Sequence, residues 1–249
     1  MYSFIHFNNL SLQSLELHTY AESNLVKTET IDISSLQSAV SESTKIYVLI
    51  PSQLFGYSVY ENANEFKGDI LKAHVLSEVE DRLISDISSL DFFYDASRNV
   101  ASWIDAAIYQ KILNAINALE AEIFLFPEHY LILNHVDALL IYQNKFTLAF
   151  KDGSGFGGSS ESLSAYLAMI EDNGHVFSNM SDWSNSNTQT VIVTSQANKA
   201  PISLAELHHK FLGQEDLKQT NYFKRKLSFQ FLRSKLKLDL IETISIAVF

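Results

Sequence analysis

Apolar residues near the start of the chain form short runs that predict strands. Residues 2–7 are an apolar run, and Leu15 and Leu17 alternate with polar residues as in a return strand. Residues 45–50 are apolar almost throughout, which is typical of a strand covered on both faces, and Pro51 ends this run. The first fifty residues therefore predict a sheet with a buried strand.

A helix is predicted over residues 71–87 by apolar residues that recur at spacings of three and four. Its stripe consists of Leu76, Val79, Leu83 and Ile87. If this stripe is the packed face, the charged residues between its members lie on a solvated face.

Strands are predicted next at residues 91–94 and 100–106. A second apolar stripe from Ile104 to Leu119 predicts another helix, and the run at 122–126, closed by Pro127, predicts the strand after it. Strand, helix and strand with short links are typical of a crossover unit within one helix-covered sheet.

A hairpin is predicted by two short apolar runs, residues 137–142 and 145–150, joined by Gln143 and Asn144. A glycine-rich loop follows at residues 152–158. Ser159 or Ser160 then has the position of a helix cap. The core face of this third helix is predicted to contain the apolar residues Leu163, Tyr166, Leu167 and Ile170.

The last part of the chain predicts fewer elements. Asn173 and Gly174 have the composition of a helix end, and residues 178–190, rich in Ser, Asn and Thr, that of an exposed loop. A strand is expected at 190–194 and a helix at 204–212.

Composition excludes several classes of function. The 249 residues include 29 Asp and Glu but only 18 Lys and Arg, which gives a formal charge of −11 and argues against nucleic acid as a partner. There are no cysteines, so disulfides, thiolate metal sites and a cysteine nucleophile are excluded. No apolar run reaches the roughly 18 residues expected of a membrane span.

Several local patterns occur in the order found in the type II secretion system L protein (GspL) family. They are a buried strand ending in Pro51, the helix segment 80–87, the second helix 106–119, the element Phe126-Pro127-Glu128 and the pair Gly155-Phe156. Residues 45–170 of this chain resemble the cytoplasmic domain of that family. The first 40 residues and the last third match it loosely.

The resemblance implies an α/β fold with degenerate actin-like (ribonuclease H-like) lobes, whose mixed sheets are covered by helices. Residues 1–180 are expected to form the lobes, with the family-matching core at 45–170, and residues 181–249 a closing segment with a basic tail. In that family the domain lies on the cytoplasmic face of the bacterial inner membrane as a scaffold. Its implied partners are the secretion ATPase (GspE-like), the platform M protein (GspM-like), a second copy in a homodimer, and the membrane through a following segment.

Two other functions remain open on the sequence. The type IV pilus assembly M family (PilM-like) shares this fold, so a nucleotide-binding pilus assembly protein is the alternative to a scaffold without enzymatic activity. A hydrolase or transferase of unrelated fold is a third interpretation.

The glycine-rich loop 152–158 is the most suggestive chemical feature. Glycine backbones approach phosphates closely, and this loop lies between a strand and a helix. It lacks the lysine and the Ser/Thr spacing of a P-loop, however, and residues 7–10 contain neither glycine nor aspartate. The sequence therefore favours a turn followed by a helix cap, and we expect no nucleotide or other cofactor.

Histidines and carboxylates predict no metal or catalytic site. His208 and His209 are adjacent, so on a helix they point apart, and His6, His18, His74, His129, His135 and His175 are scattered along the chain. The carboxylates Glu78, Glu80, Asp81 and Asp86 fit a solvated helix face. We expect no catalytic, cofactor-binding or metal-ligating residues.

The tail from residue 223 to 237 is basic and has two interpretations. Lys and Arg before an apolar stretch are typical of the cytoplasmic flank of a membrane helix. Alternatively, Leu227, Phe231 and Leu236 form a core-facing stripe with solvated charges around it. The apolar residues 241–249 are too few to span a bilayer, so the first interpretation predicts that the protein continues beyond Phe249 into a membrane helix.

Overall fold

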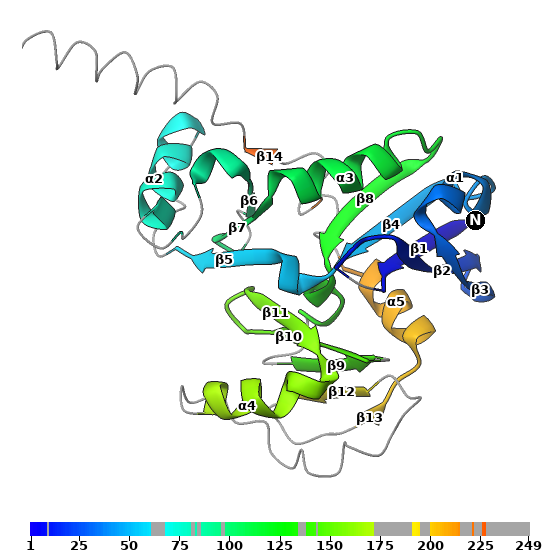
Figure 1. Cartoon of the computed structure of the whole chain (residues 1–249). Coiled ribbons are helices and arrows are strands. Elements are labelled where there is room, and N and C mark those ends of the chain that lie inside the picture. The colour runs from blue at the N-terminus through cyan, green and yellow to red at the C-terminus, as the bar shows by residue number, and fades with distance from the viewer. Residues whose placement is uncertain are drawn as a thin grey trace, which may run out of the picture.

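Three β-sheets organise the chain in the computed structural model (Figure 1). The first sheet has the order β3-β2-β1-β4-β8, the second β11-β10-β9-β12-β13 and the third β14-β6-β7-β5. The structure describes residues 1–8, 10–60, 68–80, 83, 86–95, 98–133, 138–142, 144–171, 191–194, 200–214, 221 and 226–227.

The first sheet is mixed. β1 runs parallel to β4, and β4 parallel to β8, whereas β2 is antiparallel to both β1 and β3. The buried run at 45–50 is β4, at the place between two parallel neighbours where both faces are covered. The strands are β1 (Tyr2–Phe7), β2 (Ser14–Ala21), β3 (Asn24–Asp32), β4 (Lys45–Ile50) and β8 (Glu122–Pro127).

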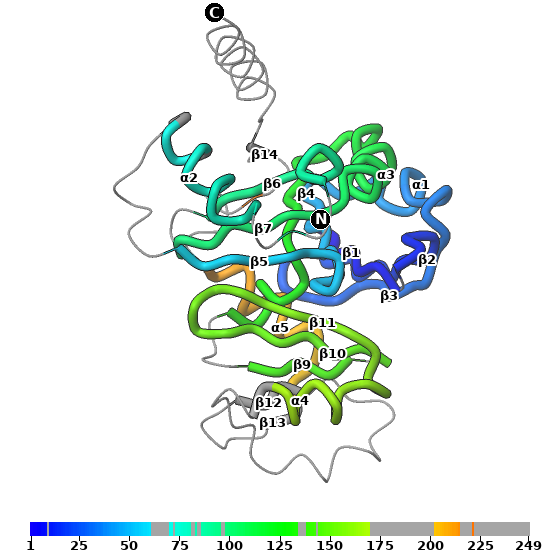
Figure 2. Tube along the Cα trace, turned by 60° about the vertical axis from the view of Figure 1, so that its left-hand side comes forward, coloured from blue at the N-terminus to red at the C-terminus, as the bar shows by residue number. Residues whose placement is uncertain are grey.

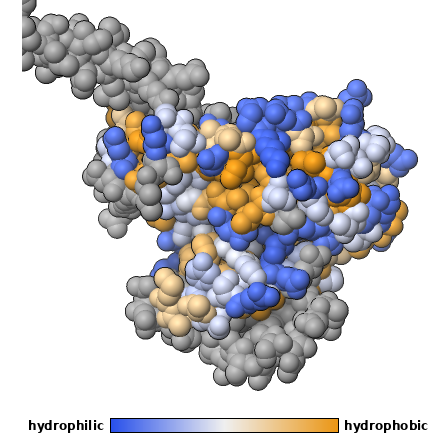
Figure 3. Space-filling model, viewed as in Figure 1, coloured by the Kyte–Doolittle hydropathy of each residue, from blue (hydrophilic) through white to orange (hydrophobic). Residues whose placement is uncertain are grey.

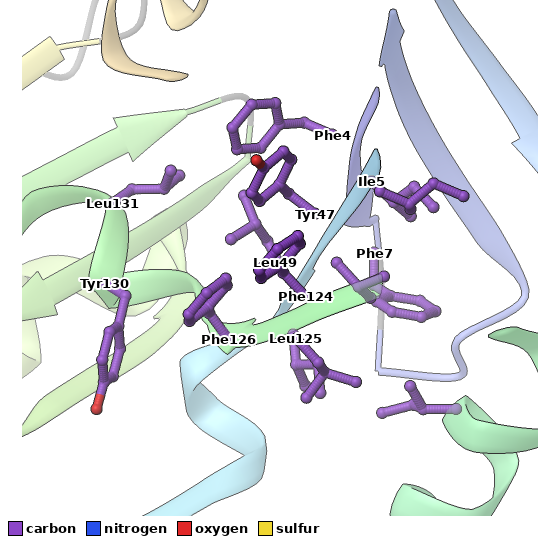
Figure 4. Close-up of a cluster of buried hydrophobic side chains, with 14 of the residues drawn as sticks. Phe4, Ile5, Phe7, Tyr47, Leu49, Phe124, Leu125, Phe126, Tyr130 and Leu131 are labelled. Atoms are coloured by element: carbon purple, nitrogen blue, oxygen red, sulfur yellow. The ribbon is translucent and has the colours of Figure 1, made fainter. Parts of the chain in front are cut away.

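Alternation along these strands divides the main core between two faces of the first sheet. Phe4, Tyr47 and Phe124 lie side by side in register, and Ile5, Val48 and Leu125 lie in register on the opposite face. Figure 4 shows the first set and Phe126 pointing to one side of the strands, and Ile5, Phe7 and Leu125 to the other. The helices that contribute to this core are α1 (Leu36–Ala39), α3 (Ala106–Ile116) and α5 (Leu204–Leu212).

The third sheet forms a smaller unit with α2 (Gly68–Glu80). The helix predicted over 71–87 is too long, because α2 ends at Glu80 and Ile87 begins a 3-10 helix, η4 (Ile87–Ser89), that Asp86 caps. Val79 is nevertheless fully buried, and Leu76, Leu83 and Ile87 pack against the same apolar cluster. The strands of this sheet are β5 (Phe55–Val59), β6 (Leu90–Asp95), β7 (Val100–Asp105) and β14 (Lys226–Leu227).

The predicted crossover unit is wrong, although its elements are present. β7 belongs to the third sheet and β8 to the first, so α3 connects two sheets. Asp105 ends β7 and accepts hydrogen bonds from Ala107 N and Ile108 N, which starts α3 at once. β7 directly precedes α3 in the sequence and β8 directly follows it, whether the two strands join one sheet or two. The local pattern therefore did not distinguish a crossover within one sheet from a connection between two sheets.

The second sheet is antiparallel where its pairings are described. The predicted hairpin is confirmed by β9 and β10, whose turn includes Gln143, outside the described residues. Leu163 and Leu167 of α4 (Leu163–Glu171) are buried in its core cluster. Its strands are β9 (Ala138–Tyr142), β10 (Lys145–Ala149), β11 (Gly155–Ser159), β12 (Val191–Thr194) and β13 (Ala200–Pro201).

Both edges of the first sheet carry features that limit further pairing. On β3, the register with β2 shifts at Thr19/Tyr20, and the exposed strand carries Lys27; bulges and lysines are common ways to block an edge. On β8, the buried Asn221 side chain accepts from Leu125 N at 2.9 Å and donates to Ile123 O at 3.1 Å. Strand β3 was missed in the sequence because its exposed residues show no apolar pattern.

The 3-10 helix η5 (Glu128–Ile132) leads from β8 towards the second sheet, and all five of its residues are buried. Figures 1 and 2 both show α5 between the first and second sheets. Apolar residues on the face drawn in Figure 3 gather in its upper part, around α3. The predicted helix end at 173–174, the loop 178–190 and the segment 228–249 lie outside the described residues, as does the basic tail except for Lys226 and Leu227.

Candidate functional site

The carboxyl ends of β1, β4 and β8 meet at one edge of the first sheet, where open α/β sheets usually bind their ligands. Here Lys145 of β10 reaches this edge. Its Nζ donates to Phe7 O at 2.9 Å and lies 3.3 Å from Glu128 Oε1. A side chain from the second sheet thus occupies part of the junction between the first and second sheets.

Glu128 is the centre of this junction. The buried carboxylate accepts from Lys145, from Thr147 Oγ1 at 3.2 Å and from His6 Nδ1 at 3.3 Å. Burial alone would raise the pKa of Glu128, but the charge of Lys145 and the bond from His6 outweigh it and hold the pKa at about 2. Glu128 is therefore an ionised, fully partnered acceptor rather than an acid with a proton to give at neutral pH.

Three histidines, from β1, β2 and α5, meet beside Glu128. His6 Nε2 lies 2.8 Å from His208 Nε2, and His208 Nδ1 lies 2.7 Å from Tyr20 Oη. The His18 ring is 5.6 Å from that of His6 and 5.3 Å from that of His208, between ring centres. The His208 ring also stacks on Phe4 at 3.9 Å.

A second buried carboxylate, Glu16, lies on the β2 side of this cluster. Its Oε1 is 3.2 Å from His18 Nε2, and it also accepts a hydrogen bond from Tyr142 of β9. Burial opposes ionisation of Glu16, but the nearby His18 ring and the hydrogen bond from Tyr142 keep its pKa at about 2. The Tyr142 bond is a second link between the first and second sheets.

The description of six histidines as scattered is therefore wrong for His6 and His18, which meet His208 of the adjacent pair His208 and His209. Period-two alternation already places Glu16, His18 and Tyr20 on one face of β2, and a hairpin closing after residue 7 brings His6 opposite Glu16. The sequence held that signal, whereas the arrival of His208 depends on α5 packing across the sheet. Among the described residues, no group of three or more His, Asp or Glu side chains is arranged to hold a metal ion.

The glycine-rich segment is not a loop over its whole length. Only residues 151–153 form the turn, and Gly155–Ser159 is strand β11, paired with β10. A Cβ on Gly155 would lie 2.1 Å from His129 Cγ, and one on Gly157 would lie 3.2 Å from Phe146 O. These glycines permit close packing of the second sheet against η5 and β10. The expected cap is confirmed at Ser159, which accepts from Glu161 N at the start of a 3-10 helix, η6 (Ser160–Ser162), before α4.

His129 occupies the other side of the junction. Its Nε2 donates to Gly153 O at 3.3 Å, so Nδ1 accepts from the hydroxyls of Ser52, at 3.1 Å, and Tyr57, at 3.3 Å. Burial, helped by the nearby charge of Arg98, lowers the pKa of His129 to about 3. This imidazole is neutral and fully engaged in holding neighbouring segments.

The remaining sequence candidates are not brought together. Glu78 and Glu80 are exposed on α2, and Asp86 accepts from Ser88 N as a cap. Asp81, His135 and His175 lie outside the described residues. None of the helices in the described part of the chain has both the length and the apolar composition needed to cross a membrane.

Comparison with known proteins gives matches at the level of structure. No family model matches the sequence, and no curated protein matches it. The cytoplasmic domain of EpsL, an inner membrane component of the type II secretion system of Vibrio cholerae, superposes with a TM-score of 0.59 at 11% identity, over 90% of this chain and 99% of that one.

Two further solved structures match less of the chain. One is a protein of unknown function with an actin-like ATPase fold from Bacteroides thetaiotaomicron, with a TM-score of 0.40 at 10% identity over 69% of this chain and 76% of that one. The other is a PilM-PilN type IV pilus biogenesis complex, with a TM-score of 0.40 at 10% identity over 64% of this chain and 63% of that one. The chain thus has the fold of the EpsL cytoplasmic domain, which confirms the α/β fold class expected from the resemblance.

Proposed function

We propose that this chain is a cytoplasmic scaffold domain of a type II secretion inner-membrane platform, and that it recruits the secretion ATPase by protein–protein contact. The observation that carries the proposal is the likeness to the EpsL cytoplasmic domain over 90% of this chain and 99% of that one. The order of the sequence patterns over residues 45–170 independently supports the same family.

The geometry of the junction between the first and second sheets supports a scaffold rather than an ATPase. Lys145, Glu128 and Thr147 satisfy one another at the edge where an α/β sheet would hold phosphates. The glycines of β11 pack against His129 and β10. A nucleotide at this edge would have to displace Lys145 from Phe7 O and leave Glu128 without its cation, at a cost of several kcal/mol.

Partner binding tests the scaffold role directly. The purified chain is expected to bind the secretion ATPase encoded in the same genome, and also the platform M protein, in calorimetric titrations. The matched control is the type IV pilus assembly ATPase of the same organism, which should not bind. Binding to the pilus ATPase in place of the secretion ATPase would contradict the proposal.

Nucleotide binding separates the scaffold from the pilus-type alternative. Titration with Mg-ATP is expected to give no saturable heat at micromolar concentrations. A dissociation constant in the low micromolar range would favour a nucleotide-binding assembly protein instead. Fractionation of the native protein should place it with the inner membrane, facing the cytoplasm.

A further inference from the structure

The hydrogen bonds around His6 and His208 have a fixed direction at neutral pH. Glu128 is ionised and only accepts, so His6 carries its proton on Nδ1 and exposes a lone pair at Nε2. His208 must then donate from Nε2 across the 2.8 Å contact, and its Nδ1 accepts from Tyr20 Oη. With both imidazoles neutral, each polar atom that links Glu128, His6, His208 and Tyr20 therefore has a hydrogen-bond partner.

This arrangement has room for one additional proton. If His208 is charged, its Nδ1 donates to Tyr20 Oη, so the tyrosine hydroxyl accepts this hydrogen bond instead of donating it. The hydrogen bond from His208 Nε2 to His6 remains. If His6 is also charged, two N–H groups face each other across 2.8 Å with two positive charges on neighbouring rings. The doubly protonated pair therefore cannot keep this contact.

The contact lies where α5 packs on the first sheet. His208 lies on α5 between Leu207 and Phe211, both fully buried in the main core, and Phe211 packs edge-on against Phe126 at 5.2 Å. His6 is connected through Glu128 to Lys145 and Thr147 of β10. One pair of imidazoles thus connects α5 and the second sheet to the first sheet.

We propose that the His6–His208 pair is an acid-released latch. The pair keeps α5 packed on the first sheet while it carries at most one extra proton, and α5 separates from the sheet when both rings are charged. The titratable groups that face the pair are Glu16, His18 and Tyr20 from β2, Glu128 from η5, Tyr142 from β9 and Lys145 from β10.

Burial of the pair sets the range in which the latch opens. It lowers the pKa of His6, against the opposing effect of Glu128, and lowers that of His208 well below its ordinary value. The latch is therefore closed at neutral pH and opens below about pH 6.5, the ordinary histidine value. Because release needs a second proton, it depends on pH more steeply than the titration of one site.

His208→Gln is the sharpest test. A glutamine amide donates to His6 Nε2 and accepts from Tyr20 Oη as neutral His208 does, and it rotates to accept from a charged His6, but it takes up no proton. Hydrogen exchange of residues 204–212, compared with residues 45–50 of β4, reports release of α5 separately from global unfolding. The matched control is His209→Gln, an exposed position on the same helix.

In the wild type and in His209→Gln, acid should lower the protection factors of the α5 amides, the intrinsic exchange rate divided by the observed rate at each pH, at least tenfold before β4 loses protection. In His208→Gln, α5 should stay protected at that pH. Equal loss of protection in α5 and β4, or identical acid profiles for His208→Gln and wild type, would overturn the proposal. Should His208→Gln fold poorly, NMR titration of the wild-type imidazoles decides, since His6 and His208 must become charged where α5 opens.

Discussion

The two sides of the junction between the first and second sheets are stabilised by different means. On the α5 side, Glu128, Lys145 and the His6–His208 pair form a charged and hydrogen-bonded network. On the other side, Gly155 lets β11 pack directly on the neutral His129 ring. Glu128 and His129 are adjacent in η5, so one short helix supports both sides. The α5 side therefore depends on paired charges. The His129 side depends on a glycine whose missing side chain leaves room for the imidazole ring.

Removing the buried cation should have the largest effect. Lys145→Met leaves Glu128 buried without its charged partner, which is expected to cost about 3–5 kcal/mol in the free energy of unfolding. The matched control is Lys210→Met, which breaks an exposed helix pair with Glu206 and should cost below about 0.5 kcal/mol. Urea titration measures both, and equal losses would contradict the importance of the buried network.

Filling the glycine side should come next. Gly155→Ala places a Cβ 2.1 Å from His129 Cγ, and such overpacking is expected to cost about 1–3 kcal/mol. Gly213→Ala is the control, because the nearest atom to its added Cβ is Lys210 O at 3.5 Å and it should change stability by less than about 0.5 kcal/mol. A Gly155→Ala protein as stable as Gly213→Ala would show that the close approach is not needed.

The pH dependence of stability separates His129 from the two buried carboxylates by range: each contribution is lost as the pH falls, but in a different pH window. The folded pKa of His129, about 3, lies below the unfolded value of about 6.5, so unfolding takes up a proton between these values. Its contribution is fully present above pH 6.5 and is lost as the pH falls towards 3. His129→Gln should reduce the slope of unfolding free energy by about 1.4 kcal/mol per pH unit in this window.

Glu128 and Glu16 act at lower pH. Their folded pKa values of about 2 lie below the ordinary carboxylate value, so their contribution is present above about pH 4.5 and lost below it. If the slope of unfolding free energy between pH 4.5 and 6.5 is the same in His129→Gln as in the wild type, the His129 imidazole of the folded wild type is not held neutral.

The smallest effect is expected at the Tyr142 link. Tyr142→Phe removes the hydrogen bond to Glu16 while keeping the ring, and should cost about 0.5–1.5 kcal/mol. The double variant with Glu16→Gln tests whether the loss comes from that bond, since the two losses should then fail to add. Full additivity would assign the effect of Tyr142 to packing alone.

Much of the secondary structure followed from the sequence alone. The strands at 2–7, 45–50 and 122–127, the hairpin 138–149 and the helix 204–212 were predicted nearly residue for residue, because each is a strong local apolar pattern. Strand β3 was missed because its residues are mostly exposed, and α2 was extended past Glu80 because the apolar spacing continues beyond the helix.

Tertiary structure decided the sheet membership and the site. Whether β7 and β8 share a sheet depends on long-range pairing, which a local pattern does not encode. His6, His18 and Tyr20 could be placed on one hairpin from alternation. His208 joins them from a helix, and it is separated from His6 by 202 residues in the sequence. The glycines of β11 looked like a loop because a Gly-rich run carries no apolar pattern, and only the His129 ring packed against them gives the physical reason for their lack of side chains.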